Sequence, residues 1–293
     1  MSSRAPKLIA TIVFFMLFLA LSLYLTFPTE ALKKRVESEI DNNTGFHAEI
    51  DSISFSPFLK LSINGLRLDK RAKDISIQVD ELKIKPSVLS LLLDNKSVPF
   101  EAKIGEGKVD GNVVFGPDTN SLSSVRAELK NVHTDLISSF TKSGADSPEF
   151  DGNIDGVVNV DFGQRNTQDV SGSFNFTSDN MSISKLTFEG FTLPSYKNLL
   201  VNLNGKIEKK KTVIDELSFE NNDFDLLMVG SMPLIWEIKK GGKLDLRLNL
   251  NLKSDEAKSG LLQAFMKKET DGSLSAKIAG TTSKPKFVKS EKL

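Results

Sequence analysis

The residues with the widest chemical range in this chain are its histidines, His47 and His133, the only two among 293 residues. An imidazole acts as a general base or a metal ligand when a carboxylate, a hydroxyl or a second ligand stands beside it. Neither histidine belongs to a His/Asp/Ser arrangement, and the chain contains no cysteine. The surroundings of His47, Gly-Phe-His-Ala-Glu, predict a half-buried strand histidine. The histidines therefore do not predict a catalytic centre.

A pair of carboxylates, Asp110 and Asp155, lies within an internal repeat. The five-residue stretch Gly107–Gly111 recurs as Gly152–Gly156, and the two stretches differ at two positions. An aspartate beside a glycine is typical of a turn, and a recurring short motif indicates a repeated structural unit. We interpret both aspartates as turn residues of a repeated β unit. No phosphate-binding loop, dinucleotide-binding glycine pattern or metal-ligand spacing is found, so we expect no cofactor, no metal site and no enzymatic activity.

The most strongly patterned element is the uncharged apolar stretch Leu8–Phe27. At about 1.5 Å per residue, twenty helical residues cover roughly 30 Å, the thickness of a bilayer core. A cleaved signal peptide is the alternative, with Ala20–Ser22 as the cut site, but apolar sequence resumes at once. We therefore predict a cytoplasmic tail over residues 1–7 and an uncleaved transmembrane anchor over 8–27. Because positive charge flanks both ends, the orientation follows from the default export of a long downstream domain.

The composition excludes several classes of partner. Lysine plus arginine equals aspartate plus glutamate at 38 each, so no net charge attracts nucleic acid or an anionic membrane surface. The lack of cysteine excludes disulfides and cysteine metal sites. Twenty phenylalanines against one tryptophan and two tyrosines favour a dry apolar interior over a polar binding site.

Residues 28–45 form the predicted juxtamembrane helix. Leu32, Val36 and Ile40 are spaced four apart, which places them on one helical face. Gly45 is a suitable helix stop. Two interpretations are open, a helix that docks on a membrane surface or partner, and a spacer that packs on the first strand of the following domain. We favour the spacer.

From Phe46 onward the apolar period changes from 3.6 to 2, which predicts a β domain over residues 46–293. Asn64-Gly65 is a turn or bulge signal, and Lys209–Lys211 predicts a solvated hairpin tip. Short helices are expected at Val88–Leu93, around Leu136–Phe140 and after Ser254. A polar linker predicts a subdivision near residues 142–150. Few helices are long enough to cover a large sheet.

The clearest strand predicted from the sequence runs from Leu244 to Leu252. Its alternate positions on one face are all leucine, and these are the candidate groove- or core-lining residues: Leu244, Leu246, Leu248, Leu250 and Leu252. The opposite face is polar throughout, and a one-sided sheet must cover its apolar face. Closure as a sandwich or barrel is one solution. The other is a curved trough that takes up acyl chains.

Several stretches resemble a known family. Leu25–Arg35 is similar to the start of the N-component proteins of type II secretion systems (the GspN family), and Leu59–Leu68 is similar to a further element of that family. Leu82–Leu92 and the closing Gly280–Phe287 resemble the broader AsmA-like group of membrane-anchored β proteins. The resemblance covers most of the chain, but its motifs are structural and define no functional residues.

The resemblance implies a mainly β protein of the inner membrane, with a large curved antiparallel domain in the periplasm. It further implies a non-enzymatic component of a type II secretion system that docks on other proteins of the apparatus. The alternative is an AsmA-like module that binds or transfers phospholipid in an apolar β groove. Both readings expect the membrane as a partner and no nucleic acid.

Overall fold

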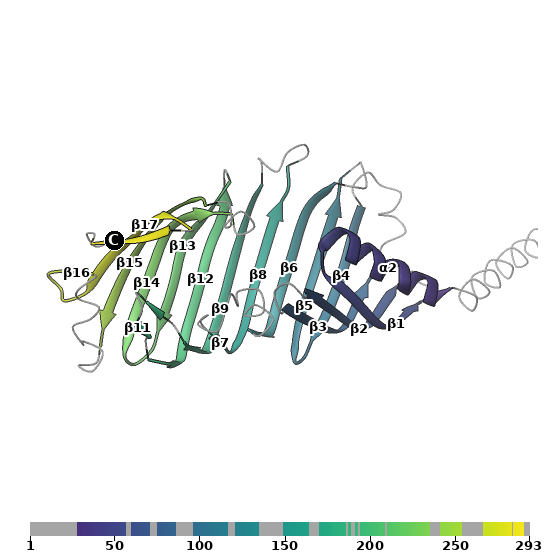
Figure 1. Ribbon diagram of the computed structural model, residues 1–293, viewed down its shortest axis with the longest axis horizontal. Helices are drawn as coiled ribbons and strands as arrows, with labels where there is room; N and C mark the ends of the chain where they lie inside the picture. The colour runs from purple at the N-terminus through teal and green to yellow at the C-terminus, as the bar shows by residue number, and fades with distance from the viewer. Residues whose placement is uncertain are drawn as a thin grey trace, which may run out of the picture. The chain divides into compact units, whose positions relative to one another are not determined.

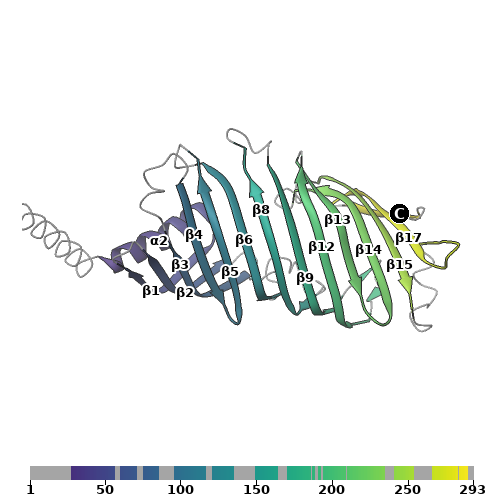
Figure 2. The same cartoon turned by 180° about the vertical axis from the view of Figure 1, so that it is seen from behind.

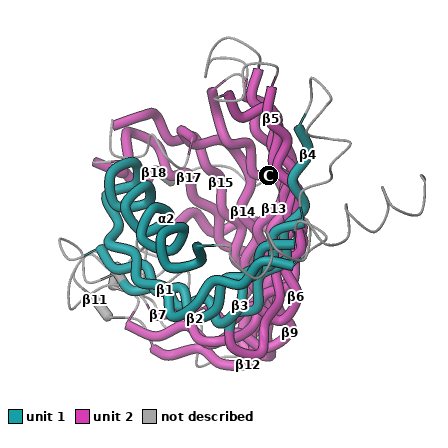
Figure 3. The backbone as a smooth tube through the Cα atoms, turned by 90° about the vertical axis from the view of Figure 1, so that its right-hand side faces the viewer, with its two compact units in different colours: residues 1–104 teal, residues 105–293 magenta. Residues whose placement is uncertain are grey.

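The computed structural model describes residues 28–56, 60–70, 75–85, 96–116, 121–134, 149–163, 170–185, 187–188, 191–192, 194–208, 210–234, 241–253, 266–282 and 284–289. The chain divides into two compact units, Met1–Ile104 and Gly105–Leu293, coloured separately in Figure 3. The predicted tail and anchor over residues 1–27 lie outside the described residues. Within the described ranges, no helix has the length and apolar character needed to cross a membrane. The described chain is mainly β and antiparallel, as predicted.

Unit 1 contains one described helix and a sheet. Its elements are α2 (Thr29–Thr44), β1 (His47–Phe55), β2 (Leu61–Lys70), β3 (Ile75–Ile84) and β4 (Lys96–Ile104). The strands pair antiparallel in chain order, and α2 lies against β1 (Figure 1). Helix α2 confirms the helix predicted at residues 28–45. It ends at Gly45, whose φ of 69° is left-handed and therefore suits glycine.

In unit 1 the alternation of apolar residues shifts by one residue, and the shift occurs at neighbouring positions of β1, β2 and β3. Two rows of paired apolar residues flank these positions: Ile50, Leu66 and Val79 on one side, and Ile53, Ile63 and Leu82 on the other. Between them Asp51 and Gly65 drop out of the ladder, and Gly65 has a φ of 62°. Strand β2 continues through Asn64 and Gly65, so no hairpin turn forms there, and the break in the ladder at Gly65 agrees with the other predicted alternative, a bulge. The left-handed glycine interrupts the alternation and allows both rows to be buried.

Unit 2 is a larger antiparallel sheet. Its strands are β5 (Gly107–Phe115), β6 (Leu122–His133), β7 (Glu149–Asp151), β8 (Asn153–Asp161), β9 (Ser171–Ser184), β10 (Thr187–Phe188), β11 (Phe191–Thr192), β12 (Tyr196–Glu208), β13 (Lys211–Glu220), β14 (Phe224–Pro233), β15 (Lys243–Leu252), β16 (Lys267–Lys268), β17 (Leu274–Thr281) and β18 (Lys284–Lys289). The order is β5-β6-β8-β9-β12-β13-β14-β15-β17-β16 (Figure 1), seen from behind in Figure 2. Strand β7 pairs with β9, β18 pairs with β17, and β10 and β11 form a separate ribbon.

Most predicted features of unit 2 that fall on described residues are confirmed. Strands β12 and β13 form the hairpin expected around Lys209–Lys211, and Lys210 occupies its turn with a φ of 67°. The closing segment Lys284–Lys289 forms strand β18, which pairs antiparallel with β17. The short helices predicted at Val88–Leu93, around Leu136–Phe140 and after Ser254 lie outside the described residues. The subdivision predicted near residues 142–150 falls within unit 2.

Buried clusters of unit 2 lie toward the ends of its strands. On β12, Leu199 and Val201 near the start join one cluster, with Met181 and Ile183. Ile207 near the end of the same strand joins another, with Val170 and Leu234. A third cluster contains Leu250, Met266, Leu274 and Ala276. The middle of the sheet face lies between these clusters.

Candidate functional site

A continuous apolar row crosses the middle of the unit 2 sheet, from β5 to β17. Each member pairs directly with the next across neighbouring strands, and directly paired residues point to the same face. We call this set the central row: Val109, Leu129, Gly156, Phe176, Leu203, Leu217, Met228, Leu248 and Ala276. Gly156 has no side chain, the small Ala276 is buried, and the other side chains of the row are half-buried. The row thus presents apolar surface that the described residues do not fully cover.

A second row lies beside the central row on the same face. It contains small residues and glycines among larger apolar ones, and we call it the glycine row: Gly111, Ala127, Val158, Phe174, Gly205, Ile214, Gly230, Leu246, Ile278 and Phe287. No polar side chain occurs in either row. The two rows together form an uninterrupted apolar strip across the sheet.

Phenylalanine rings cover two glycines of this strip, Gly156 and Gly205. A Cβ atom added to Gly205 would lie 2.4 Å from Cζ of Phe174, so the ring of Phe174 lies directly over the glycine backbone. The rings of Phe174 and Phe176 stack with centroids 6.2 Å apart. Rings that lie over glycine shield the backbone and add little height. This part of the strip is therefore apolar and shallow.

The opposite face of the same strands is polar. Asn175 donates from Nδ2 to Oδ1 of Asn204, and Asn204 in turn donates from Nδ2 to Oε2 of Glu216 at 3.2 Å. Asp110 and Glu128 are paired in the same row, toward β5. The sheet of unit 2 therefore has one apolar and one polar face, as the alternation of its strands predicts.

The repeated aspartates do not occupy turns, contrary to the prediction. Asp110 lies within β5, where it forms an ion pair with Lys108 at 3.0 Å. Asp155 lies within β8, and its Oδ1 accepts a hydrogen bond from the backbone N–H of Asn131 at 2.9 Å. Each aspartate is already engaged by a neighbouring group on the polar face, so the two do not form an acid–base pair.

The five candidate leucines lie on β15 and share one face, as predicted. Leu246 and Leu250 are buried, while Leu248 and Leu252 pack against the cluster around Leu274. Leu248 belongs to the central row and Leu246 to the glycine row. The leucine face of β15 is thus one end of a much longer strip, which sequence reasoning did not identify because its members come from different strands.

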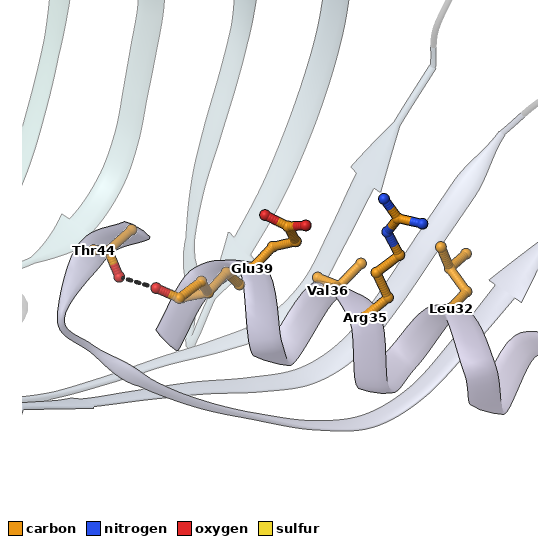
Figure 4. Close-up of a pocket in the computed structure, with 6 residues that line it drawn as sticks. Leu32, Arg35, Val36, Glu39 and Thr44 are labelled. Carbon is orange, nitrogen blue, oxygen red and sulfur yellow. Dashed lines mark hydrogen bonds between the residues drawn. The ribbon is translucent and has the colours of Figure 1, made fainter. Parts of the chain in front are cut away.

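A smaller apolar site lies on α2 in unit 1. Leu32, Val36 and Ile40 line an open depression of about 340 Å³, together with Arg35, Glu39 and Thr44. Figure 4 shows Leu32, Arg35, Val36 and Glu39 projecting from one side of the helix. All three apolar residues are half-buried, and α2 contains no buried residue. The apolar stripe predicted to pack on the first strand therefore lines an open depression and is only partly buried.

The two histidines each contact a carboxylate. His47 Nδ1 lies 3.0 Å from Oδ2 of Asp41, and His133 Nε2 lies 3.2 Å from Oδ1 of Asp151. Across the described residues, no group of three or more histidine, aspartate or glutamate side chains is arranged to hold a metal ion. Both histidines lie on strands, as predicted for His47.

Comparison with protein-family models, curated proteins and solved structures finds no match to this chain. The resemblance to secretion and AsmA-like proteins therefore remains a prediction. The apolar strip of unit 2 is the structural feature that bears on function.

Proposed function

We propose that this chain is a membrane-anchored, non-enzymatic protein that binds the acyl chains of phospholipids along the apolar strip of unit 2. The observation that supports the proposal is the central row, a continuous line of apolar residues opposite a polar face, most of them half-buried. Exposed apolar surface of this extent is unfavourable in water, at about 25 cal/mol per Å², unless a ligand or partner covers it. The anchor over residues 8–27 would hold the domain at the inner membrane, with its bulk in the periplasm.

The dimensions of the strip suit a hydrocarbon chain. Neighbouring strands lie about 4.8 Å apart, so the row from β5 to β17 is roughly 40 Å long. A bilayer core of about 30 Å contains two leaflets, which gives each acyl chain roughly 15 Å. The strip therefore has room for an extended acyl chain, and its lack of polar side chains gives no directional contact to a head group. We expect selectivity for the hydrocarbon part of the lipid.

The test is lipid binding by the full-length chain. Bound lipid is extracted and identified by mass spectrometry, and uptake is followed with a fluorescent phospholipid in phosphatidylethanolamine–phosphatidylglycerol vesicles. The variant Leu203→Gln with Met228→Gln places amides in the central row, and we expect at least a tenfold loss of uptake. The matched control is Leu200→Gln with Leu227→Gln, which changes two exposed leucines on the opposite face of the same strands. A wild-type chain without lipid and without uptake would reject the proposal.

A second candidate is the docking role in a type II secretion apparatus, which rests on the resemblance. The observation that favours it is the open apolar depression on α2. Since the chain has no cysteine, Val36→Cys allows a single photo-crosslinker to be attached there. Capture of a secretion-system protein from Val36, but not from the exposed control Lys34→Cys, supports docking. Lipid uptake without such capture would reject the docking role and support only the lipid-binding proposal.

A further inference from the structure

Helix α2 is bound to the edge of β1 through its charged side chains. Among the described strands of unit 1, β1 pairs only with β2, so its other edge presents unpaired backbone groups. The N–H of Ala48 donates to Oδ1 of Asp41 at 2.7 Å, and the N–H of Ile50 donates to Oε1 of Glu37 at 2.9 Å. Lys33 Nζ completes the contact by donating to the carbonyl oxygen of Asp51 at 3.3 Å.

The two carboxylates take the place of the carbonyl oxygens of a missing strand. Residues two apart in a strand are separated by about 6.8 Å, and residues four apart in a helix by about 6 Å along its axis. Glu37 and Asp41 therefore match the spacing of Ile50 and Ala48. The helix runs antiparallel to β1, as a neighbouring strand of this sheet would. An exposed edge of this kind is a pairing site that proteins normally cover.

The contacts described between α2 and β1 are made by the polar side chains of the helix. Helix α2 has no buried residue, and its apolar stripe Leu32, Val36 and Ile40 faces the open depression, about 100° around the helix from the stripe of Lys33 and Glu37. Gly45 joins α2 to β1 in a left-handed conformation, and nothing lies within 4 Å of a Cβ built there. A rotation of the chain at Gly45 would move the helix off β1 while β1 keeps its pairing with β2.

The edge under α2 is complementary to itself. If two copies of Phe46–Ile50 pair antiparallel about Ala48, Phe46 of one copy lies opposite Ile50 of the other. In the same register His47 lies opposite Glu49 of the second copy. Because the contact is symmetric, this pair forms twice in the dimer. Apolar pairs on one face and histidine–carboxylate pairs on the other are favourable cross-strand neighbours. Ala48 and Ile50, whose N–H groups α2 now binds, are the residues that would donate to the second strand.

We propose that α2 blocks a homodimer interface: it occupies the edge of β1, and its release lets β1 pair with β1 of a second copy of this chain. The interface is isologous and centred on Ala48. The inference rests on unit 1 alone and does not depend on the proposed lipid binding.

The first test weakens the contact between α2 and the edge of β1. The full-length chain in detergent carries Glu37→Ala with Asp41→Ala, and its mass and dimer dissociation constant are measured by light scattering across a dilution series. We expect the dissociation constant to fall at least tenfold. The matched control is Glu30→Ala with Glu39→Ala, which removes two carboxylates from the same helix that form no hydrogen bond with the described residues of β1, and it should behave as wild type. Equal association in both variants would overturn the proposal.

The second test checks the register. In the uncovered variant, His47→Glu places a carboxylate opposite Glu49 of the other copy and should abolish the gain in association. Adding Glu49→His exchanges the pair and should restore it. Amide hydrogen exchange of Ala48 and Ile50 supplies the readout for folding and release. If the Glu37→Ala, Asp41→Ala variant keeps its strand content by circular dichroism and is still monomeric, that result overturns the proposal. This holds whether these amides exchange fast or are still protected.

Discussion

The phenyl ring of Phe176 lies across the backbone of Gly156 on the neighbouring strand. A Cβ atom added to Gly156 would come within 2.3 Å of Cδ1 of Phe176 and 2.6 Å of the backbone oxygen of Asn175. The ring occupies the space above the glycine, where a side chain would otherwise rise from the sheet. This contact makes the central row continuous across a position that has no side chain of its own.

Replacing Gly156 with alanine should therefore destabilise unit 2. Because both the ring of Phe176 and a backbone oxygen must move, we expect a loss of about 1–3 kcal/mol, typical of overpacking. The measurement is the free energy of unfolding from urea titration. Ser173→Ala, at an exposed position of β9, should change it by less than about 0.5 kcal/mol. Equal effects of the two substitutions would show that the ring does not lie closely on Gly156.

Truncation of leucines should separate the buried cluster from the central row. Leu250 is 8% exposed and packs with Met266 and Leu274, so Leu250→Ala should lower the free energy of unfolding by about 2–5 kcal/mol. Leu203 is half-buried in the central row, and Leu203→Ala should lower it by clearly less. Urea titration of both variants in lipid-free protein provides the comparison. Equally large losses would mean that the row is a closed core, contrary to the proposed lipid binding.

The strands and their apolar faces could be predicted from the sequence, but the strip could not. Alternation is local, so the five leucines of β15 are recognisable by themselves. The pairing of Leu203 with Leu217 is not, because the register of β12 and β13 shifts at Asn204 and Gly205. Counting back from the hairpin tip would pair Leu203 with Glu216. A bulge of one residue thus hides which residues share a row.

The position of α2 shows a second limit of the sequence pattern. The helix was predicted from Leu32, Val36 and Ile40, and burial of that stripe on the first strand was the favoured interpretation. The helix does lie on β1, but through Glu37 and Asp41. The unpaired N–H groups of an edge strand need acceptors, and the side chains of α2 supply them. Nothing in the helix sequence alone indicates that this requirement decides which face docks.

The contact between α2 and β1 should weaken in acid. The pKa of Asp41 is lowered from its usual value of 3.8 by the backbone N–H of Ala48, with a further hydrogen bond from His47. A carboxyl group with a lowered folded-state pKa stabilises the fold above its unfolded pKa, and that contribution is lost as the pH falls through the folded value. We therefore expect the contact to be fully present near neutral pH and to weaken below about pH 4.

Hydrogen exchange of the Ala48 amide measures this directly. Its protection, corrected for the intrinsic rate at each pH, should be constant from pH 7 to about pH 5 and should fall below about pH 4. Asp41→Asn should reduce the protection at neutral pH and remove most of its dependence on pH. The amide of Ala276, buried in unit 2, serves as the control for global unfolding. A parallel fall at Ala276 would attribute the change to unfolding and contradict a local release.

The conformation of Gly65 should be required for the shift in alternation across unit 1. With a φ of 62°, an L-residue at this position would cost roughly 1–2 kcal/mol. A Cβ atom would also lie 2.4 Å from Cγ and 2.9 Å from Cβ of Asp51. Gly65→Ala should therefore destabilise unit 1 through both strain and collision. In an Asp51→Gly background only the strain remains, so the same substitution should lower the free energy of unfolding by a smaller amount. Urea titration of the four proteins of this double-mutant cycle gives the difference, which reports the collision alone. An identical loss in both backgrounds would show that Asp51 does not restrict this site, and that the φ angle of residue 65 by itself enforces glycine.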